Sequence, residues 1–223
     1  MGIFDTRLFE DKKARFQKKL IEWGRKNLIM YPWRRSENPY ELLVAEILLH
    51  RTRAEQVLPV YEEFIRTYPD INALYRSDCR ELERLLHPLG LRWRARLLHE
   101  MARVIVEKFG SKIPENYDEL LSLPGVSDYT ASAVRCFAFG YPEPLLDTNT
   151  VRVVGRVFGI RVTDSTRRNR AFRNFMKSLV PEENPKMFNY ALLDFGKTVC
   201  RVRSPNCDSC TLAPICVASG KIK

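Results

Sequence analysis

Apolar residues recur with the 3.6-residue period of an α-helix along almost the whole chain, and no segment alternates as a half-buried strand does. In the first periodic segment, Leu8, Phe16, Leu20 and Trp23 share one face, opposite a basic face. Proline, glycine and asparagine separate the segments and mark where helices begin or end. The periodic segments predict helices at residues 7–28, 39–50, 54–68, 79–86, 92–109, 128–139, 149–158, 166–179 and 186–198. The sequence therefore predicts an all-α protein.

The composition narrows the classes of partner. The 223 residues carry a formal net charge of +10 and a pI near 9.4, which favours a polyanion or an acidic membrane surface. No apolar run reaches the roughly 18–20 residues that a membrane span needs, and the N-terminus lacks the apolar core of a signal peptide. We therefore expect an intracellular protein, a monomer that does not bind membranes.

Four of the six cysteines lie close together near the C-terminus. Cys200, Cys207, Cys210 and Cys216 are spaced C-x6-C-x2-C-x5-C. Without a secretion signal, disulfides are not expected, and four thiolates so close can enclose a zinc ion or a [4Fe–4S] cluster. The two remaining cysteines, Cys79 and Cys136, fall in helical segments and are expected in the core.

A Pro-Gly turn lies between two predicted helices and reads L-P-G-V-S-D-Y-T from Leu123 to Thr130. Such a turn can direct backbone N–H groups outward, where they bind a phosphate. Asp147 follows one helix later, at a boundary rich in proline, threonine and asparagine. A carboxylate there either caps the next helix or stands free to stabilise a positive charge.

Together, the hairpin, the trailing Asp147-Thr148-Asn149 and the cysteine spacing resemble the helix-hairpin-helix DNA glycosylases related to endonuclease III and MutY. The resemblance extends from P-W-R at 32–34 to Cys216. It implies two helical domains, residues 34–147 and residues 1–33 with 148–223, with the active-site cleft between them. It also implies a [4Fe–4S] cluster held by the loop at 200–216, and double-stranded DNA with a mismatched or damaged base as the partner.

Three residues are expected to carry the chemistry. Asp147 would stabilise the oxocarbenium-like sugar as the N-glycosidic bond breaks. Tyr129 stands where family members that also cut the strand have a lysine, and tyrosine cannot form their Schiff base. Glu46 lies in the apolar helix L-L-V-A-E-I-L-L, and the resemblance places it in the base pocket as a proton donor or a base contact. The enzyme is therefore expected to be a glycosylase without lyase activity.

Further residues are expected to bind DNA. The turn residues Gly125, Val126 and Ser127, with Thr130, would seat a phosphate, and Arg201 and Arg203 would extend the basic surface. Ser127 replaces the usual glycine of the turn, which costs energy if the position needs a positive φ, but the serine could instead cap the following helix. His50 and Arg51 would either fill the gap left by a flipped nucleotide or contact phosphates.

A second group of basic residues surrounds Trp33 and Trp93, and its side chains could be solvated or could contact DNA. Two alternatives stay open for these residues, solvated helix faces or contact with DNA, and Trp93 could instead enter the duplex: Arg34, Arg35, Arg92, Trp93 and Arg94.

The choice of base follows from departures within the family. Tyr129, Glu46 and D-T-N at 147–149 fit both adenine glycosylases of the MutY type and mismatch thymine/uracil glycosylases. R-T-R at 51–53 and G-L-R-W at 90–93 depart from the adenine enzymes, and the chain ends seven residues after Cys216, without their C-terminal domain. We therefore favour excision of thymine or uracil opposite guanine. Adenine excision opposite 8-oxoguanine or guanine, and DNA binding without catalysis, are the alternatives.

Overall fold

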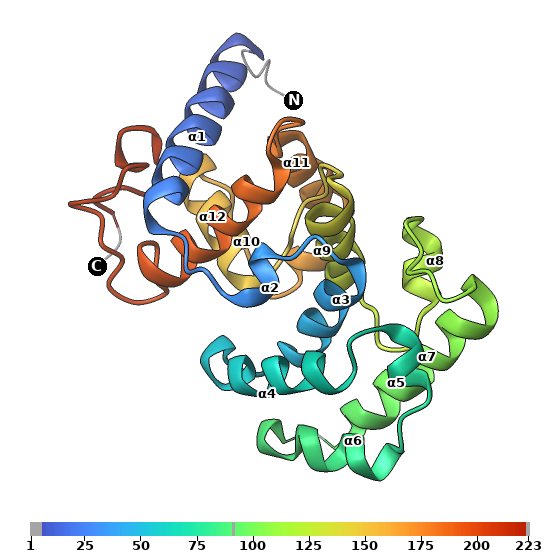
Figure 1. Cartoon of the computed structure of the whole chain (residues 1–223). Coiled ribbons are helices and arrows are strands. Elements are labelled where there is room, and N and C mark those ends of the chain that lie inside the picture. Colours follow the sequence, from blue (N-terminus) through green and yellow to red (C-terminus); the bar gives the residue numbers. More distant parts are fainter. Residues whose placement is uncertain (1–5, 91, 222–223) are drawn as a thin grey trace. The chain divides into compact units, whose positions relative to one another are not determined.

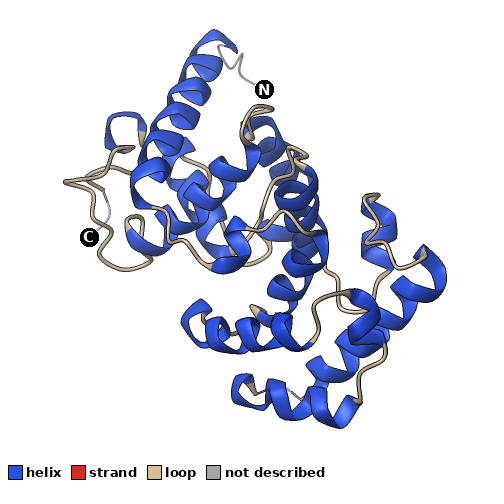
Figure 2. Cartoon of the chain, viewed as in Figure 1, coloured by secondary structure: helices blue, strands red, loops and turns tan. Residues whose placement is uncertain are grey.

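The computed structural model describes residues 6–90 and 92–221, and every regular element within them is a helix (Figures 1 and 2). The all-α prediction is confirmed. None of these helices is both long and apolar enough to cross a membrane. The chain divides into two compact units, the first formed by Met1–Ile29 with Gly140–Lys223, and the second by Met30–Phe139.

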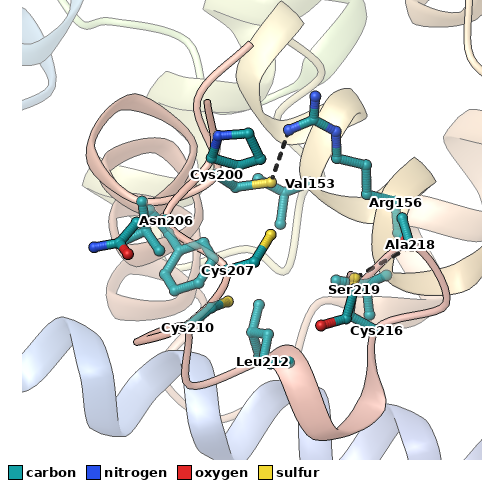
Figure 3. A pocket seen from close by; sticks show the side chains of 15 residues that line it. Val153, Arg156, Cys200, Asn206, Cys207, Cys210, Leu212, Cys216, Ala218 and Ser219 are labelled. Carbon is teal, nitrogen blue, oxygen red and sulfur yellow. Dashed lines mark hydrogen bonds between the residues drawn. The ribbon is translucent and has the colours of Figure 1, made fainter. Parts of the chain in front are cut away.

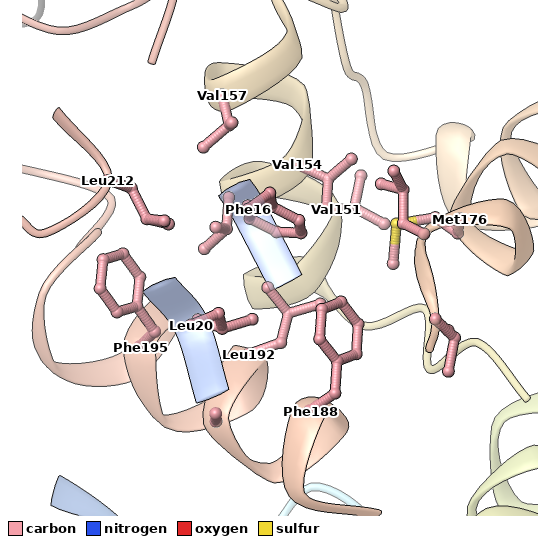
Figure 4. Close-up of a cluster of buried hydrophobic side chains, with 14 of the residues drawn as sticks. Phe16, Leu20, Val151, Val154, Val157, Met176, Phe188, Leu192, Phe195 and Leu212 are labelled. Carbon is pink, nitrogen blue, oxygen red and sulfur yellow. The ribbon is translucent and has the colours of Figure 1, made fainter. Parts of the chain in front are cut away.

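The first unit is built around the contact between its N-terminal helix and a C-terminal one. Helix α1 packs along α12, and α12 also packs on α10. Phe16 and Leu20 of α1 are fully buried in the core that these helices share with Phe188 and Phe195 (Figure 4). Burial of such large apolar side chains is the main force that joins the two ends of the chain. The elements of this unit are α1 (Thr6–Asn27), α10 (Thr148–Phe158), the 3₁₀ turn η2 (Thr166–Arg168), α11 (Arg170–Leu179), α12 (Pro185–Thr198) and the 3₁₀ turn η3 (Ala213–Ile215).

The second unit surrounds helix α3, which is buried at every position from 42 to 48. Helix α3 packs on α9 and also contacts α4 and α7. A helix that is apolar on all sides is typical of a position inside the unit. The elements of this unit are α2 (Pro32–Arg35), α3 (Pro39–Leu48), α4 (Ala54–Thr67), α5 (Ile71–Tyr75), α6 (Cys79–Leu86), the 3₁₀ turn η1 (His87–Leu89), α7 (Trp93–Phe109), α8 (Tyr117–Ser122) and α9 (Asp128–Phe139).

Some local predictions were wrong. Leu8 is 68% exposed, and Phe9 packs against the core in its place. The helix expected at 166–179 is interrupted by Asn169, whose side chain accepts a hydrogen bond from the backbone N–H of Phe172 and so caps α11. Cys136 is buried as expected, whereas Cys79, the first residue of α6, is only half-buried. Contacts divide the chain after Ile29 and after Phe139, and the division at residues 33 and 147 that the family resemblance implies stays a prediction.

Candidate functional site

The Pro-Gly turn joins α8 to α9 and depends on Gly125. This residue has φ +77°, where side chains are disfavoured, and a Cβ atom there would collide with the side chain of Leu97. The backbone N–H of Val126 donates to the carbonyl of Leu123 over 3.2 Å and closes the turn. Gly125 and Ser127 are exposed, and within the described chain their backbone N–H groups have no hydrogen-bond partner. Two amides without a hydrogen-bond partner are therefore available to an anion.

Ser127 caps helix α9. Its Oγ accepts a hydrogen bond from the backbone N–H of Thr130 over 3.2 Å, as predicted for a capping serine. Its φ is not positive, so the strain considered for a serine in place of glycine does not arise. Thr130 is fully buried, with its hydroxyl 3.1 Å from that of Ser127, and the Val126 side chain is also buried. These two residues therefore reach the surface only through the turn that they support.

Tyr129 lies in the first turn of α9 and is half-buried. It comes two residues after Ser127 in the chain. A phenol at this position supplies a hydroxyl but no amine.

Asp147 is the N-cap of α10 and is half-buried. Its Oδ1 accepts from the backbone N–H of Thr150 over 2.7 Å, and its own backbone N–H donates to the Thr150 hydroxyl over 3.0 Å. Asn149 Nδ2 donates to Oδ2 over 3.0 Å. Both carboxylate oxygens therefore accept hydrogen bonds. Capping and stabilisation of a positive charge are compatible roles for Asp147, because the cap fixes the orientation of the carboxylate. The helix N-terminus also favours its negative charge.

A hydrogen-bond chain runs from Asp147 to the cysteine loop. Asn149 Oδ1 accepts from Arg152 Nη2 over 2.9 Å, and Arg152 Nε donates to the carbonyl of Cys200 over 2.9 Å. Arg156 Nη1 lies 3.4 Å from Cys200 Sγ and 2.7 Å from the Arg201 carbonyl. Burial lowers the pKa of Arg152 from its ordinary value. Asn149, Arg152 and Arg156 were not predicted as site residues from the sequence. All three lie on the helix that Asp147 caps, and this proximity in the sequence could have indicated them.

The four C-terminal cysteines line one pocket (Figure 3). They form no disulfide, and the pocket walls include the apolar side chains of Val153, Phe195 and Leu212. Burial raises the pKa of the Cys210 and Cys216 thiols. Within the described residues, no three histidine, cysteine or acidic side chains lie close enough together to hold a single metal ion. The loop therefore gathers four thiols at one pocket.

The basic residues of this loop, Arg201 and Arg203, are exposed. Arg201 Nη2 donates to the Ser204 carbonyl over 3.0 Å, which keeps its guanidinium close to the loop. Both side chains are placed where they can meet a polyanion.

Glu46 is buried, with 7% of its surface exposed, as its apolar flanks predicted. It lies on α3, one helical turn before His50 and Arg51, which form the turn after that helix. His50 is half-buried and Arg51 is exposed. Burial, then the charges of Arg94 and Arg51, lower the pKa of His50.

Among the second basic group, one expectation was wrong: Arg94 is fully buried. Its Nη2 donates to the His50 carbonyl and, over 2.7 Å, to the Thr52 hydroxyl. Arg92 is exposed and Trp93 is 45% exposed, while Arg34 and Arg35 lie at the end of α2. Two groupings result: α3 with its turn and the α8–α9 hairpin belong to the second unit, and Asp147 and the cysteine loop to the first.

Comparison with known proteins gives a consistent set of similarities. Residues 44–179 match the family model described as HhH-GPD superfamily base excision DNA repair protein. The chain is 42% identical to the thymine/uracil-DNA glycosylase of Pyrobaculum aerophilum, over 92% of this chain and 91% of that protein. It is 40% identical to the thymine-DNA glycosylase of Aeropyrum pernix, over 94% and 97% of the two chains.

Solved structures agree with these similarities. A thermostable thymine-DNA glycosylase superposes with a TM-score of 0.91 at 32% identity, covering 96% of this chain and 99% of that one. Endonuclease III in a non-covalent DNA complex superposes with a TM-score of 0.77 at 26% identity, covering 94% and 97% of the two chains.

Proposed function

Because this chain belongs to the HhH-GPD superfamily of base excision DNA repair proteins, we propose that it is a DNA glycosylase that hydrolyses the N-glycosidic bond of thymine or uracil mispaired with guanine. The observation that carries the proposal is Asp147, a carboxylate held at both oxygens at the head of α10, shortly after the hairpin. Simple phosphate binding has no use for such a group, because an anion weakens it.

DNA binding is assigned to the α8–α9 turn and the basic loops. The unpaired amides of Gly125 and Ser127 suit one backbone phosphate, and Arg201 and Arg203 add positive charge. The similarity to endonuclease III solved with DNA supports duplex DNA as the partner. We expect the protein to act as a monomer.

The reaction assigned here is hydrolysis. As the bond between C1′ and the base nitrogen breaks, the Asp147 carboxylate stabilises the positive charge on the sugar. Glu46, buried on α3, supplies a proton or a hydrogen bond to the departing base. Water then bonds to C1′ and leaves an abasic site. Tyr129 has no amine with which to attack C1′, so the strand stays intact.

The choice of base is supported by the relatives. The thymine/uracil and thymine enzymes at 42% and 40% identity match almost end to end. Arg51, Arg92 and Trp93 are positions at which this chain departs from the usual pattern of the adenine enzymes.

The cysteine loop is assigned a [4Fe–4S] cluster, with Cys200, Cys207, Cys210 and Cys216 as its ligands. The donor set fits: four free thiols line one pocket. Four thiolates can bind either a zinc ion or a [4Fe–4S] cluster, and the spacing C-x6-C-x2-C-x5-C, which resembles that of the endonuclease III family, favours the cluster. When bound, the cluster would hold the loop in shape. Arg156, near Cys200 Sγ, would offset the negative charge of the thiolates.

One assay tests the proposal. Duplexes that contain G·T, G·U or adenine opposite 8-oxoguanine are incubated with the protein, and abasic sites are then cleaved with alkali. Product from G·T and G·U is expected. Product from the adenine duplex alone would overturn the choice of base, and no product from any duplex would leave a DNA-binding protein without glycosylase activity.

A further inference from the structure

Arg94 is an arginine with no exposed surface, and it reaches from α7 to the turn that follows α3. Its Nη2 donates to the carbonyl of His50 and to the hydroxyl of Thr52. A single guanidinium nitrogen thus holds the residue before Arg51 and the residue after it.

Arg51, between these two anchors, has an unusual backbone. Its φ is +57°, in the left-handed region where the Cβ atom crowds the neighbouring carbonyl. A non-glycine residue keeps this conformation only where surrounding contacts impose it. The left-handed backbone directs the exposed Arg51 side chain away from the course that a continued α3 would give it. The turn itself contributes two hydrogen bonds, from the Thr52 backbone N–H to the Leu49 carbonyl over 3.2 Å and from the Thr52 hydroxyl to the His50 carbonyl over 3.4 Å. The contacts that reach the turn from another helix are those of Arg94.

Arg94 is poorly suited to a purely stabilising role. Its Nε and Nη1 atoms are buried, and among the described residues neither has a hydrogen-bond partner. A buried cation that is only partly paired opposes folding, and burial accordingly lowers the pKa of Arg94. An apolar side chain of similar length would avoid that cost. The His50 carbonyl and the Thr52 hydroxyl, which Arg94 now binds, could then bind water instead, because both residues are only half-buried.

We propose that Arg94 is a positioning residue that holds the His50–Thr52 turn in the conformation from which Arg51 contacts DNA. This inference rests on the proposed function, action on duplex DNA, and on the expectation from the sequence that Arg51 contacts that DNA. Arg94 itself does not contact DNA; it acts through the backbone of the turn.

A double-mutant cycle tests this role. Arg94→Met, Arg51→Ala and the combined variant are compared with the wild-type chain in affinity for a G·T duplex and in melting temperature. Arg96→Met is the matched control, since Arg96 lies on the same helix with an exposed side chain. Thr52→Val removes one anchor while Arg94 stays in place.

The expected affinity loss is about tenfold for Arg94→Met, with a smaller loss for Thr52→Val and none for Arg96→Met. In the Arg51→Ala background, Arg94→Met should cause no further loss of affinity. The melting temperature of the Arg94→Met single variant should equal or exceed that of the wild type. Arg94→Lys, which keeps a donor, should recover part of the affinity.

Two outcomes would overturn the inference. One is additive losses in the cycle, and the other is a melting temperature that falls in parallel with affinity, as for a structural residue. Because binding is measured, a wild-type chain that excises no base would refute the proposed function and leave this cycle intact. An active wild-type chain with additive losses would refute the inference alone.

Discussion

Asn149 donates a hydrogen bond from Nδ2 to Oδ2 of Asp147 over 3.0 Å. The opposite end of the same amide accepts from Arg152, which also binds the Cys200 carbonyl. One side-chain amide therefore connects the carboxylate at the head of α10 to the cysteine loop. The orientation of Asp147 depends on this chain as well as on its own helix.

The Asp147→Asn variant should fold and bind DNA but lose turnover. Asparagine caps helices about as well as aspartate, so α10 is preserved, whereas the charge that stabilises the sugar cation is removed. We expect single-turnover excision from a G·T duplex to slow by at least about 10³-fold, with duplex affinity within about tenfold of wild type. Turnover similar to wild type would exclude Asp147 from the chemistry.

Asn149→Ala should slow excision by about tenfold, because one oxygen of Asp147 loses its partner and small displacements of a catalytic group are costly. The single-turnover rate at saturating enzyme is the measurement. Asn174→Ala, at an exposed site on α11, serves as the control. Equal rates for both variants would show that the capping bonds alone orient Asp147.

Tyr129→Lys should introduce lyase chemistry. A lysine at this place in α9 carries an amine that can attack C1′ and form an imine, which borohydride reduces to a covalent protein–DNA adduct. The wild-type chain should give no adduct on the same duplex. An adduct from the wild type would contradict the hydrolytic mechanism proposed for it.

Cys207→Ser should abolish iron incorporation, whereas Cys79→Ser should leave it unchanged. Cys207 lines the four-thiol pocket, and Cys79 lies on α6 in the other unit. Iron and acid-labile sulfide per chain, with the visible absorption of the purified protein, are the measurements. Stoichiometric zinc in the wild-type chain would replace the cluster with a zinc site.

His50 should make stability depend on pH. Burial and the neighbouring Arg94 and Arg51 lower its folded-state pKa below the ordinary 6.5. The stability that comes from a neutral ring is complete above about pH 6.5 and is lost as the pH falls through the folded-state value. The free energy of unfolding of the wild type minus that of His50→Gln should therefore be smaller at about pH 5 than at about pH 8. Chemical denaturation of both proteins at each pH measures the difference, and equal differences at both would contradict the effect.

Predictions from sequence succeeded where the cause was local. The period of apolar residues located most helices, and the flanks of Glu46 indicated its burial. Ser127 was recognised as a possible cap because capping depends on a few adjacent residues. Leu8 was misplaced because position on a helix face does not say which residues a neighbouring helix covers.

The sequence by itself determined the helical class, the hairpin turn and the grouping of four cysteines, since each is encoded within a few consecutive residues. Only the tertiary structure decided that Arg152 meets Cys200, 48 residues away, and that Arg94 meets His50, 44 residues away. These contacts join side chains and backbone atoms of separate segments, and the packing of helices sets which segments come within hydrogen-bonding distance. For that reason Arg94 looked like a solvated arginine in the sequence and proved to be a buried one.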